Sequence, residues 1–173
     1  MRISIEVLDI TTAEVDAVVN AANDGLWAGG GVCGAIFRAA GMEELTRACR
    51  KIGGCPTGSA VITPGFALPA RFVIHAVGPI YQDGNHGEAD KLYNCYKKSM
   101  ELAVENGCKT IAFPLISSGI YGYPKEGAWE RALAAVMDFQ RKCASAPEVV
   151  FCVLDDGAKA LGSSILARLE DRR

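Results

Sequence analysis

The sequence lacks an excess of charge of either sign. Its 173 residues include 18 Lys and Arg against 20 Asp and Glu, so the formal net charge at pH 7 is -2. A protein that binds nucleic acid through the backbone phosphates needs clustered cations, whereas the cations here are dispersed along the chain. We therefore do not expect a nucleic-acid partner.

Residues that bind metals or build disulfide scaffolds are also scarce. The chain has only two histidines, and its seven cysteines are odd in number and include no C-x-x-C pair. Structural zinc sites usually draw on such pairs. We expect no metal site and no cofactor, and we expect most of the thiols to behave as small buried hydrophobic groups.

Long apolar runs are absent as well. No run approaches the roughly 20 residues that span a bilayer, and the N-terminal segment alternates like a strand rather than resembling a signal peptide. Half of the residues are nevertheless apolar, which is enough for a substantial core. We expect one domain over residues 1–173, a soluble cytoplasmic protein and no membrane partner.

Apolar periodicities of strand and helix type alternate along the chain. The strands are expected at Arg2–Leu8, Ala17–Asn20, Ser59–Thr63, Arg71–Val77, Thr110–Leu115 and Glu148–Leu154. The helices are expected at Val32–Ala40, at Glu43–Arg50, over a stretch that Gly107 ends as a C-cap, after Pro124, and over a final stripe of Ala160, Leu161, Ile165 and Leu169. This alternation predicts an α/β protein with a mixed, mostly parallel sheet between two layers of helices.

The segment Val18–Ala40 reads as the end of a strand, a glycine-rich turn and the start of a helix. Glycines at 29, 30 and 31 let backbone N–H groups approach an anion, and a helix that begins near Val32 aims its free amides at the same point. The spacing matches neither the dinucleotide fingerprint nor the P-loop. An anionic ligand is one interpretation, and a glycine-rich turn without a ligand is the other.

Several polar or small-residue turns follow the predicted strands. In an open parallel sheet, ligands bind beyond the carboxyl ends of the strands. If these strands are parallel, one rim of the sheet gathers Asp9, Asn23, the glycine run, the loop Ser117–Gly122 and Asp155.

Five short motifs occur in series along the chain. They are Asp9-Ile10, VNAAN at 19–23, GGGV at 29–32, HAVGP at 75–79 and ISSGIYGYP at 116–124. With these motifs the chain resembles a macrodomain from about Ile3 to Leu169. The resemblance implies a three-layer α/β/α fold that binds ADP-ribose. Many members also hydrolyse mono-ADP-ribose from acidic protein side chains, or deacetylate O-acetyl-ADP-ribose, without a metal. The resemblance implies such an activity for this chain.

The resemblance also implies roles for individual residues. Asp9 would accept a hydrogen bond from the adenine amino group, and the Ile10 amide would contact the ring. Leu154 stands where other members often place an aromatic ring against adenine, so it offers an apolar face with weaker stacking. Asn23 would bond the distal ribose, while Asn20 belongs to the binding site mainly by holding its loop in shape.

Two loops would enclose the pyrophosphate of the ligand. Their backbone N–H groups would wrap it from opposite sides, and the last residue of the second loop would cover the distal ribose. The residues concerned are Gly30, Gly31 and Val32 in the first loop and Ser117, Ser118, Gly119, Ile120 and Tyr121 in the second.

Cys33 is the main departure from the family pattern. Many hydrolytic macrodomains place an aspartate ten residues after the second asparagine of the NAAN motif, where this chain has Cys33. A thiol with a reference pKa of about 8.5 is a poorer base at neutral pH than a carboxylate is an acceptor. Some viral macrodomains carry Val-Cys there and are associated with hydrolysis. The catalytic candidates are therefore Asn23 and Cys33, with the substrate phosphate positioning the water.

Alternative interpretations remain open at this stage. The protein could be a reader that binds ADP-ribose without turnover, or it could recognise another nucleotide or nucleic acid at the same rim. Asp9 could be only a helix N-cap. His75 is expected to be a strand histidine bonded to a neighbouring loop. No local histidine or lysine would serve Cys33 as the base for covalent catalysis.

Overall fold

The computed structural model describes residues 2–172, so Met1 and Arg173, which the single-domain prediction includes, lie outside the described residues. The strands are β1 (Ile3–Val7), β2 (Ala17–Ala21), β3 (Ala60–Pro64), β4 (Phe72–Ala76), β5 (Thr110–Phe113) and β6 (Glu148–Val153). The helices are α1 (Gly31–Ala40), α2 (Met42–Ile52), α3 (Glu88–Glu105), α4 (Lys125–Lys142) and α5 (Asp156–Asp171), with a short 3-10 helix, η1, at Ile10–Thr12. The predicted elements all occur, and the ends of the six strands, α1 and α2 shift by at most two residues.

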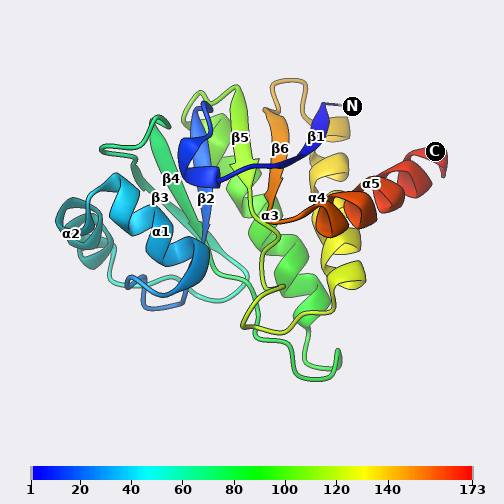
Figure 1. Ribbon diagram of the computed structural model, residues 1–173, viewed down its shortest axis with the longest axis horizontal. Coiled ribbons are helices and arrows are strands. Elements are labelled where there is room, and N and C mark those ends of the chain that lie inside the picture. Colours follow the sequence, from blue (N-terminus) through cyan, green and yellow to red (C-terminus); the bar gives the residue numbers. More distant parts are fainter. Residues whose placement is uncertain (1, 173) are drawn as a thin grey trace.

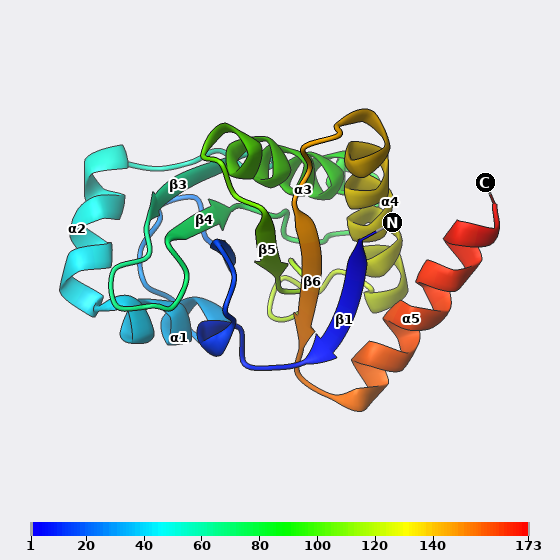
Figure 2. The ribbon, with the colours of Figure 1, turned by 90° about the horizontal axis from the view of Figure 1, so that it is seen from above.

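The six strands form one sheet in the order β1-β6-β5-β2-β4-β3. All neighbouring pairs are parallel except β3 with β4, which is antiparallel, so the prediction of a mixed, mostly parallel sheet is confirmed. Figures 1 and 2 show helices on both sides of this sheet. The strands in the middle of the sheet are buried on both faces, as the four consecutive buried residues Ala17–Asn20 of β2 show.

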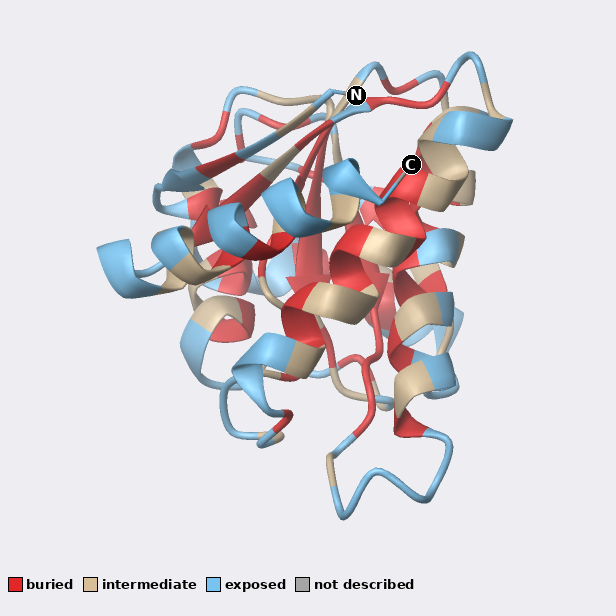
Figure 3. Cartoon of the chain, turned by 90° about the vertical axis from the view of Figure 1, so that its right-hand side faces the viewer, coloured by how far each residue is buried: buried red, intermediate tan, exposed pale blue. Residues whose placement is uncertain are grey.

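Each face of the sheet packs against its own set of helices. The larger core lies under α3, α4 and α5 and contains an aromatic group in which Phe151 packs against Trp129, Tyr96 and Phe113. The smaller core lies under α1 and α2, where Phe37 and Leu45 are fully buried. Figure 3 shows the corresponding pattern, with buried residues on the inward side of the helices and exposed residues on the outward side. These are the three predicted layers.

The C-terminal end of α3 and the buried face of α5 were both predicted at single residues. The prediction that Gly107 ends α3 is confirmed, because Gly107 has φ +71 and its N–H bonds Val104 O while the N–H of Cys108 bonds Ala103 O. These two bonds form a Schellman motif. In α5 the expected stripe was wrong at Ala160, which is exposed. The helix is rotated about its axis so that Gly162 meets the Trp129 ring, where a Cβ would lie 2.6 Å from Cζ2.

The parallel strands end at one edge of the sheet, and the loops that follow β2, β5 and β6 meet there. β1 ends beside β6, since Val7 pairs with Val153. Among residues 2–172, no helix has both the length and the apolar character needed to cross a membrane.

Candidate functional site

A cleft of about 450 Å³ opens at the carboxyl edge of the sheet. It is lined by three loop segments and a few separate residues, namely 21–23 with 29–33, 114–121, 152–155, and Gly78, Lys125 and Ala158. The predicted convergence of Asn23, the glycine run, the loop after β5 and Asp155 on one rim is therefore confirmed. Asp9 and Ile10 lie outside this lining.

The glycine run forms the entry to α1. Gly30 is the N-cap and provides no side-chain hydrogen bond, and Gly31 has φ +56, which favours glycine. Gly34 allows the loop to fold back onto the helix, because a Cβ there would lie 2.5 Å from the carbonyl oxygen of Gly29. Within residues 2–172, no group accepts a hydrogen bond from the N–H of Gly31 or Val32. These amides face the cleft together with the positive end of the helix dipole.

Asn23 fixes the shape of this loop through two hydrogen bonds to the backbone of Trp27. Its Nδ2 donates to Trp27 O at 2.9 Å, and its Oδ1 accepts from Trp27 N at 3.1 Å. An amide group has two N–H donors and two acceptor lone pairs, so one of each remains for a ligand. The predicted bond to a ribose stays a prediction, and the structure adds that Asn23 also shapes the turn.

Cys33 lies in the first turn of α1, with 7% of the residue exposed. Its Sγ lies 3.8 Å from Trp27 O, the same carbonyl oxygen that accepts from Asn23 Nδ2. Both side chains line the cleft. The structure therefore brings the two catalytic candidates together around one backbone oxygen.

The second loop is fixed at its start by Ser117, a buried residue with φ +68. Its Oγ donates to Pro79 O at 2.8 Å. Gly78 permits this contact, because a Cβ at that position would lie 2.3 Å from Ser117 Oγ. Ser118 Oγ donates to Leu115 O at 2.7 Å. The two hydroxyl groups thus hold the loop in place.

Three amides of the second loop remain available. Within the described chain, no group accepts a hydrogen bond from the N–H of Gly119, Ile120 or Tyr121, and the side chain of Ile120 is 95% exposed. The carbonyl oxygen of Tyr121 accepts from Tyr81 N at 2.8 Å, which holds the end of the loop. A rigid loop that presents free amides is suited to binding an anion.

Tyr121 lines the cleft together with the first loop. Its pKa is raised by burial and further by the nearby carboxylate of Asp24. The two loops therefore face each other across the cleft, as the resemblance implied.

Of the three residues expected to contact adenine, Leu154 lines the cleft, whereas Asp9 and Ile10 do not. Asp9 is the N-cap of η1, where its Oδ1 accepts from the N–H and the hydroxyl of Thr11 at 3.0 and 2.8 Å. Burial raises the pKa of Cys152, a residue of the cleft lining, to about 11, and the negative charge of Asp9 adds to this effect. Leu154 lines the cleft and is 83% exposed. Ile10 is buried in the smaller core.

Asn20 is buried beneath the cleft and does not line it. Its Nδ2 donates to Nδ1 of His75 at 3.1 Å, so the ring proton is on Nε2, which donates to Thr63 Oγ1 at 3.0 Å. Burial lowers the pKa of His75 to about 4, so the ring is neutral at pH 7. The expectation that a loop binds His75 was wrong, because β4 lies between β2 and β3, which supply Asn20 and Thr63, while Cys49 Sγ of α2 lies 3.8 Å from Nε2.

Lys125 is a lining residue that the sequence analysis missed. It is the first residue of α4 and follows directly after the ISSGIYGYP motif. Its position directly after the motif is the one feature of the sequence that could have identified it as a residue of the site. Cys152, Ala158 and Gly78 also line the cleft without having been singled out as ligand-binding residues.

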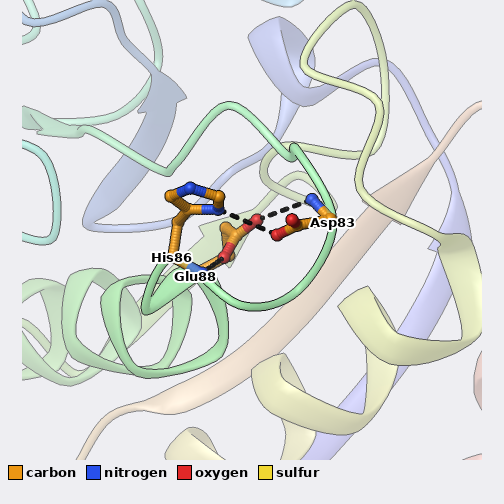
Figure 4. Close-up of side chains that lie close together, drawn as sticks. All are labelled: Asp83, His86 and Glu88. Atoms are coloured by element: carbon orange, nitrogen blue, oxygen red, sulfur yellow. Dashed lines mark hydrogen bonds and ion pairs between the residues drawn. The ribbon is translucent and has the colours of Figure 1, made fainter.

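A separate polar cluster lies where the loop before α3 enters the helix, and one side-chain N or O atom from each of Asp83, His86 and Glu88 lies within 4.8 Å of the others (Figure 4). The buried Glu88 carboxylate accepts from backbone N–H groups of residues 82, 83, 84 and 86. Burial alone would raise its pKa, but these donors lower it to about 2. His86 Nδ1 lies 2.8 Å from Asp83 Oδ1. These bonds stabilise the loop and account for the cluster.

Comparisons with known proteins agree with this geometry. The Macro domain family model matches residues 19–132. A macro domain-containing protein of Chlorobaculum tepidum is 55% identical over 148 residues, 86% of each chain. An O-acetyl-ADP-ribose deacetylase of Escherichia fergusonii is 48% identical over 177 residues, 99% of each chain.

A solved structure of the Oceanobacillus iheyensis macrodomain with ADP is 37% identical and superposes with a TM-score of 0.93. The alignment covers 98% of this chain and 92% of that one. Because the family model spans more than half of the sequence and these relatives align over most of it, this chain belongs to the macro domain family.

Proposed function

We propose that this protein binds ADP-ribose and hydrolyses esters of it, both O-acetyl-ADP-ribose and mono-ADP-ribose on acidic protein side chains. The observation that carries the proposal is the pair of facing loops, whose free backbone amides line one cleft together with Asn23 and Cys33. The protein partners would be ADP-ribosylated proteins.

Binding is supported by the chemistry of the two loops. Gly31 and Val32 line the same cleft as Gly119, Ile120 and Tyr121, the N–H groups of all five have no acceptor within residues 2–172, and the first pair lies at the positive end of α1. A pyrophosphate between them would receive hydrogen bonds from both sides. ADP in the Oceanobacillus iheyensis structure is a ligand of the same chemical class.

The adenosine end of the ligand would lie toward Leu154 and Asp9. Leu154 offers an exposed apolar face in the cleft, and Asp9 keeps its Oδ2 oxygen free of the bonds that Oδ1 makes to Thr11. A carboxylate oxygen is a suitable acceptor for the exocyclic amine of adenine.

Hydrolysis adds water across the ester bond and releases ADP-ribose and a carboxylic acid. The free lone pair and N–H of the Asn23 amide would orient the distal ribose. The Cys33 thiol, 3.8 Å from Trp27 O, would help hold the attacking water, and a phosphate oxygen of the substrate would orient it. The name of the Escherichia fergusonii relative, O-acetyl-ADP-ribose deacetylase, supports this reaction class.

A second candidate function is binding without turnover. It is favoured by one observation, that a thiol with a carbonyl partner occupies the position of the aspartate found in many hydrolytic macrodomains. The two functions share the cleft and differ only in chemistry.

Calorimetry with ADP-ribose and turnover assays with O-acetyl-ADP-ribose and an auto-ADP-ribosylated acceptor test both functions on one preparation. Binding together with release of product supports the hydrolase. Binding without product release above the buffer level at high protein concentration supports binding without turnover. Absence of ADP-ribose binding rules out both functions.

A further inference from the structure

Lys125 occupies an electrostatically unfavourable position. It is the first residue of α4, and α4 begins without a side-chain cap. The N-terminal end of a helix carries partial positive charge, so this position favours Asp or Glu over a cation. A lysine that opposes the dipole and also lines the cleft suggests a binding role, because local rules of this kind are broken most often at functional sites.

The structure offers no internal partner for this charge. Among residues 2–172, no carboxylate lies within 4.0 Å of the Lys125 ammonium. The neighbouring Glu126 pairs with Arg168 at 3.7 Å instead. Asp155, which also lines the cleft, uses its Oδ1 to accept from Ala158 N at 2.8 Å. The Lys125 ammonium is therefore available to a ligand.

Three helices begin at the cleft, and only one of them is capped by an acid. Asp155 caps α5, whereas α1 and α4 have no side-chain cap. Lys125 follows the second loop after Gly122, Tyr123 and Pro124, and it lines the same cleft as the free amides of residues 119–121. An anion bound by this loop lies within the field of both the ammonium group and the uncapped end of α4.

We propose that Lys125 binds a phosphate group of the ligand and supplies the positive charge that the two loops lack. The inference rests on the proposed function, because it names a further residue of the ADP-ribose site. Backbone amides are neutral donors, while a diphosphate carries about two negative charges, so a cation at the rim strengthens binding and speeds association. The flexible stem of lysine lets the ammonium reach the phosphates from the surface.

The test compares Lys125→Gln, Lys125→Arg and Lys97→Gln with the unaltered protein. Lys97 is exposed on α3 and does not line the cleft, so its variant removes the same charge elsewhere. At low ionic strength, Lys125→Gln should weaken ADP-ribose binding by about 3- to 10-fold, and the difference should shrink toward none in about 1 M salt. Lys125→Arg should restore binding, and adenosine, which has no phosphate, should bind all four proteins alike.

Equal ADP-ribose affinities of Lys125→Gln and Lys97→Gln would overturn the proposal, as would an equal loss of adenosine binding. Pyrophosphate, titrated in the same series, reports the Lys125 charge independently of ADP-ribose. If pyrophosphate binding falls in Lys125→Gln while the unaltered protein does not bind ADP-ribose, the proposed function fails and the assignment of Lys125 to phosphate stands.

Discussion

Asn23 and Cys33 both bond the carbonyl oxygen of Trp27, and this shared acceptor ties the two candidate catalytic side chains to one turn. The turn positions the amide and the thiol through its own backbone groups. Trp27 itself is exposed, and it contributes its backbone rather than its ring to this arrangement.

At the level of single residues, Cys33→Asp should raise the turnover of O-acetyl-ADP-ribose by about tenfold, because a carboxylate is the better acceptor at neutral pH. The new charge lies in the first turn of α1, where the helix dipole stabilises it. Steady-state kinetics with Cys33→Ser as the size-matched control measures the effect. A fall in kcat for Cys33→Asp, with ADP-ribose affinity unchanged, would show that the thiol does not limit the reaction.

At the level of elements, the second loop depends on the close approach of two backbone segments. A Cβ on Gly78 would lie 2.3 Å from Ser117 Oγ and 2.5 Å from Ile116 Cγ2. The loop between β4 and α3 and the loop after β5 therefore hold each other in position through a residue without a side chain. Motif spacing places these two loops in the sequence, but only the contact explains why the glycine is needed.

Gly78→Ala should lower the free energy of unfolding by about 1–3 kcal/mol, because the second loop must shift to admit the methyl group. ADP-ribose affinity should fall with it. Gly119→Ala is the matched control, since a Cβ there meets no atom within 4 Å, and its stability should stay within about 0.5 kcal/mol of the unaltered protein. Urea denaturation and calorimetry on both variants check this expectation, and equal stabilities would contradict it.

The contact between β2, β3 and β4 through His75 predicts a dependence of stability on pH. The unfolded chain protonates this histidine near pH 6.5, while the folded protein does so only near pH 4, because burial disfavours the charged ring. The unfolded state therefore binds more protons between these values, and stability should fall as pH falls from 6.5 to 4, by about 3 kcal/mol in all.

Denaturant titrations at pH 7, 6, 5 and 4 measure this slope. His75→Asn should flatten it, even if the variant is less stable overall. Glu88, whose folded pKa is lowered to about 2, acts in a different window, because its contribution is lost only below pH 4.5. A stability that does not change between pH 7 and 5 in the unaltered protein would rule out the role assigned to His75.

At the level of the whole molecule, the cleft lies where elements from both helical layers meet. The first loop leads into α1 on one face of the sheet, and the second loop leads into α4 on the other. A ligand that bridges the loops therefore joins segments that belong to separate hydrophobic cores.

ADP-ribose at about 100 times its dissociation constant should stabilise the protein by about 2.7 kcal/mol, because it binds only the folded state. Thermal denaturation with increasing ligand tests this, and ribose at the same concentration serves as the control. A melting temperature that does not respond to ADP-ribose would speak against binding in the cleft.

The sequence by itself determined the elements and the first loop of the site. Hydrophobic periodicity marks each strand, α1 and α2 to within two residues, and glycines at 29–31 before a helix predict free amides at its start. These features are local, because they depend on neighbours within a few residues. The same locality explains why Gly107 could be identified as the end of α3.

Only the tertiary structure decided the strand order, the antiparallel pairing of β3, and the partner of Asn20. It also brought Gly78 against Ser117 and placed Lys125 at the cleft. The physical reason is that packing between segments far apart in the chain determines which side chains meet, and no spacing within one segment contains that information.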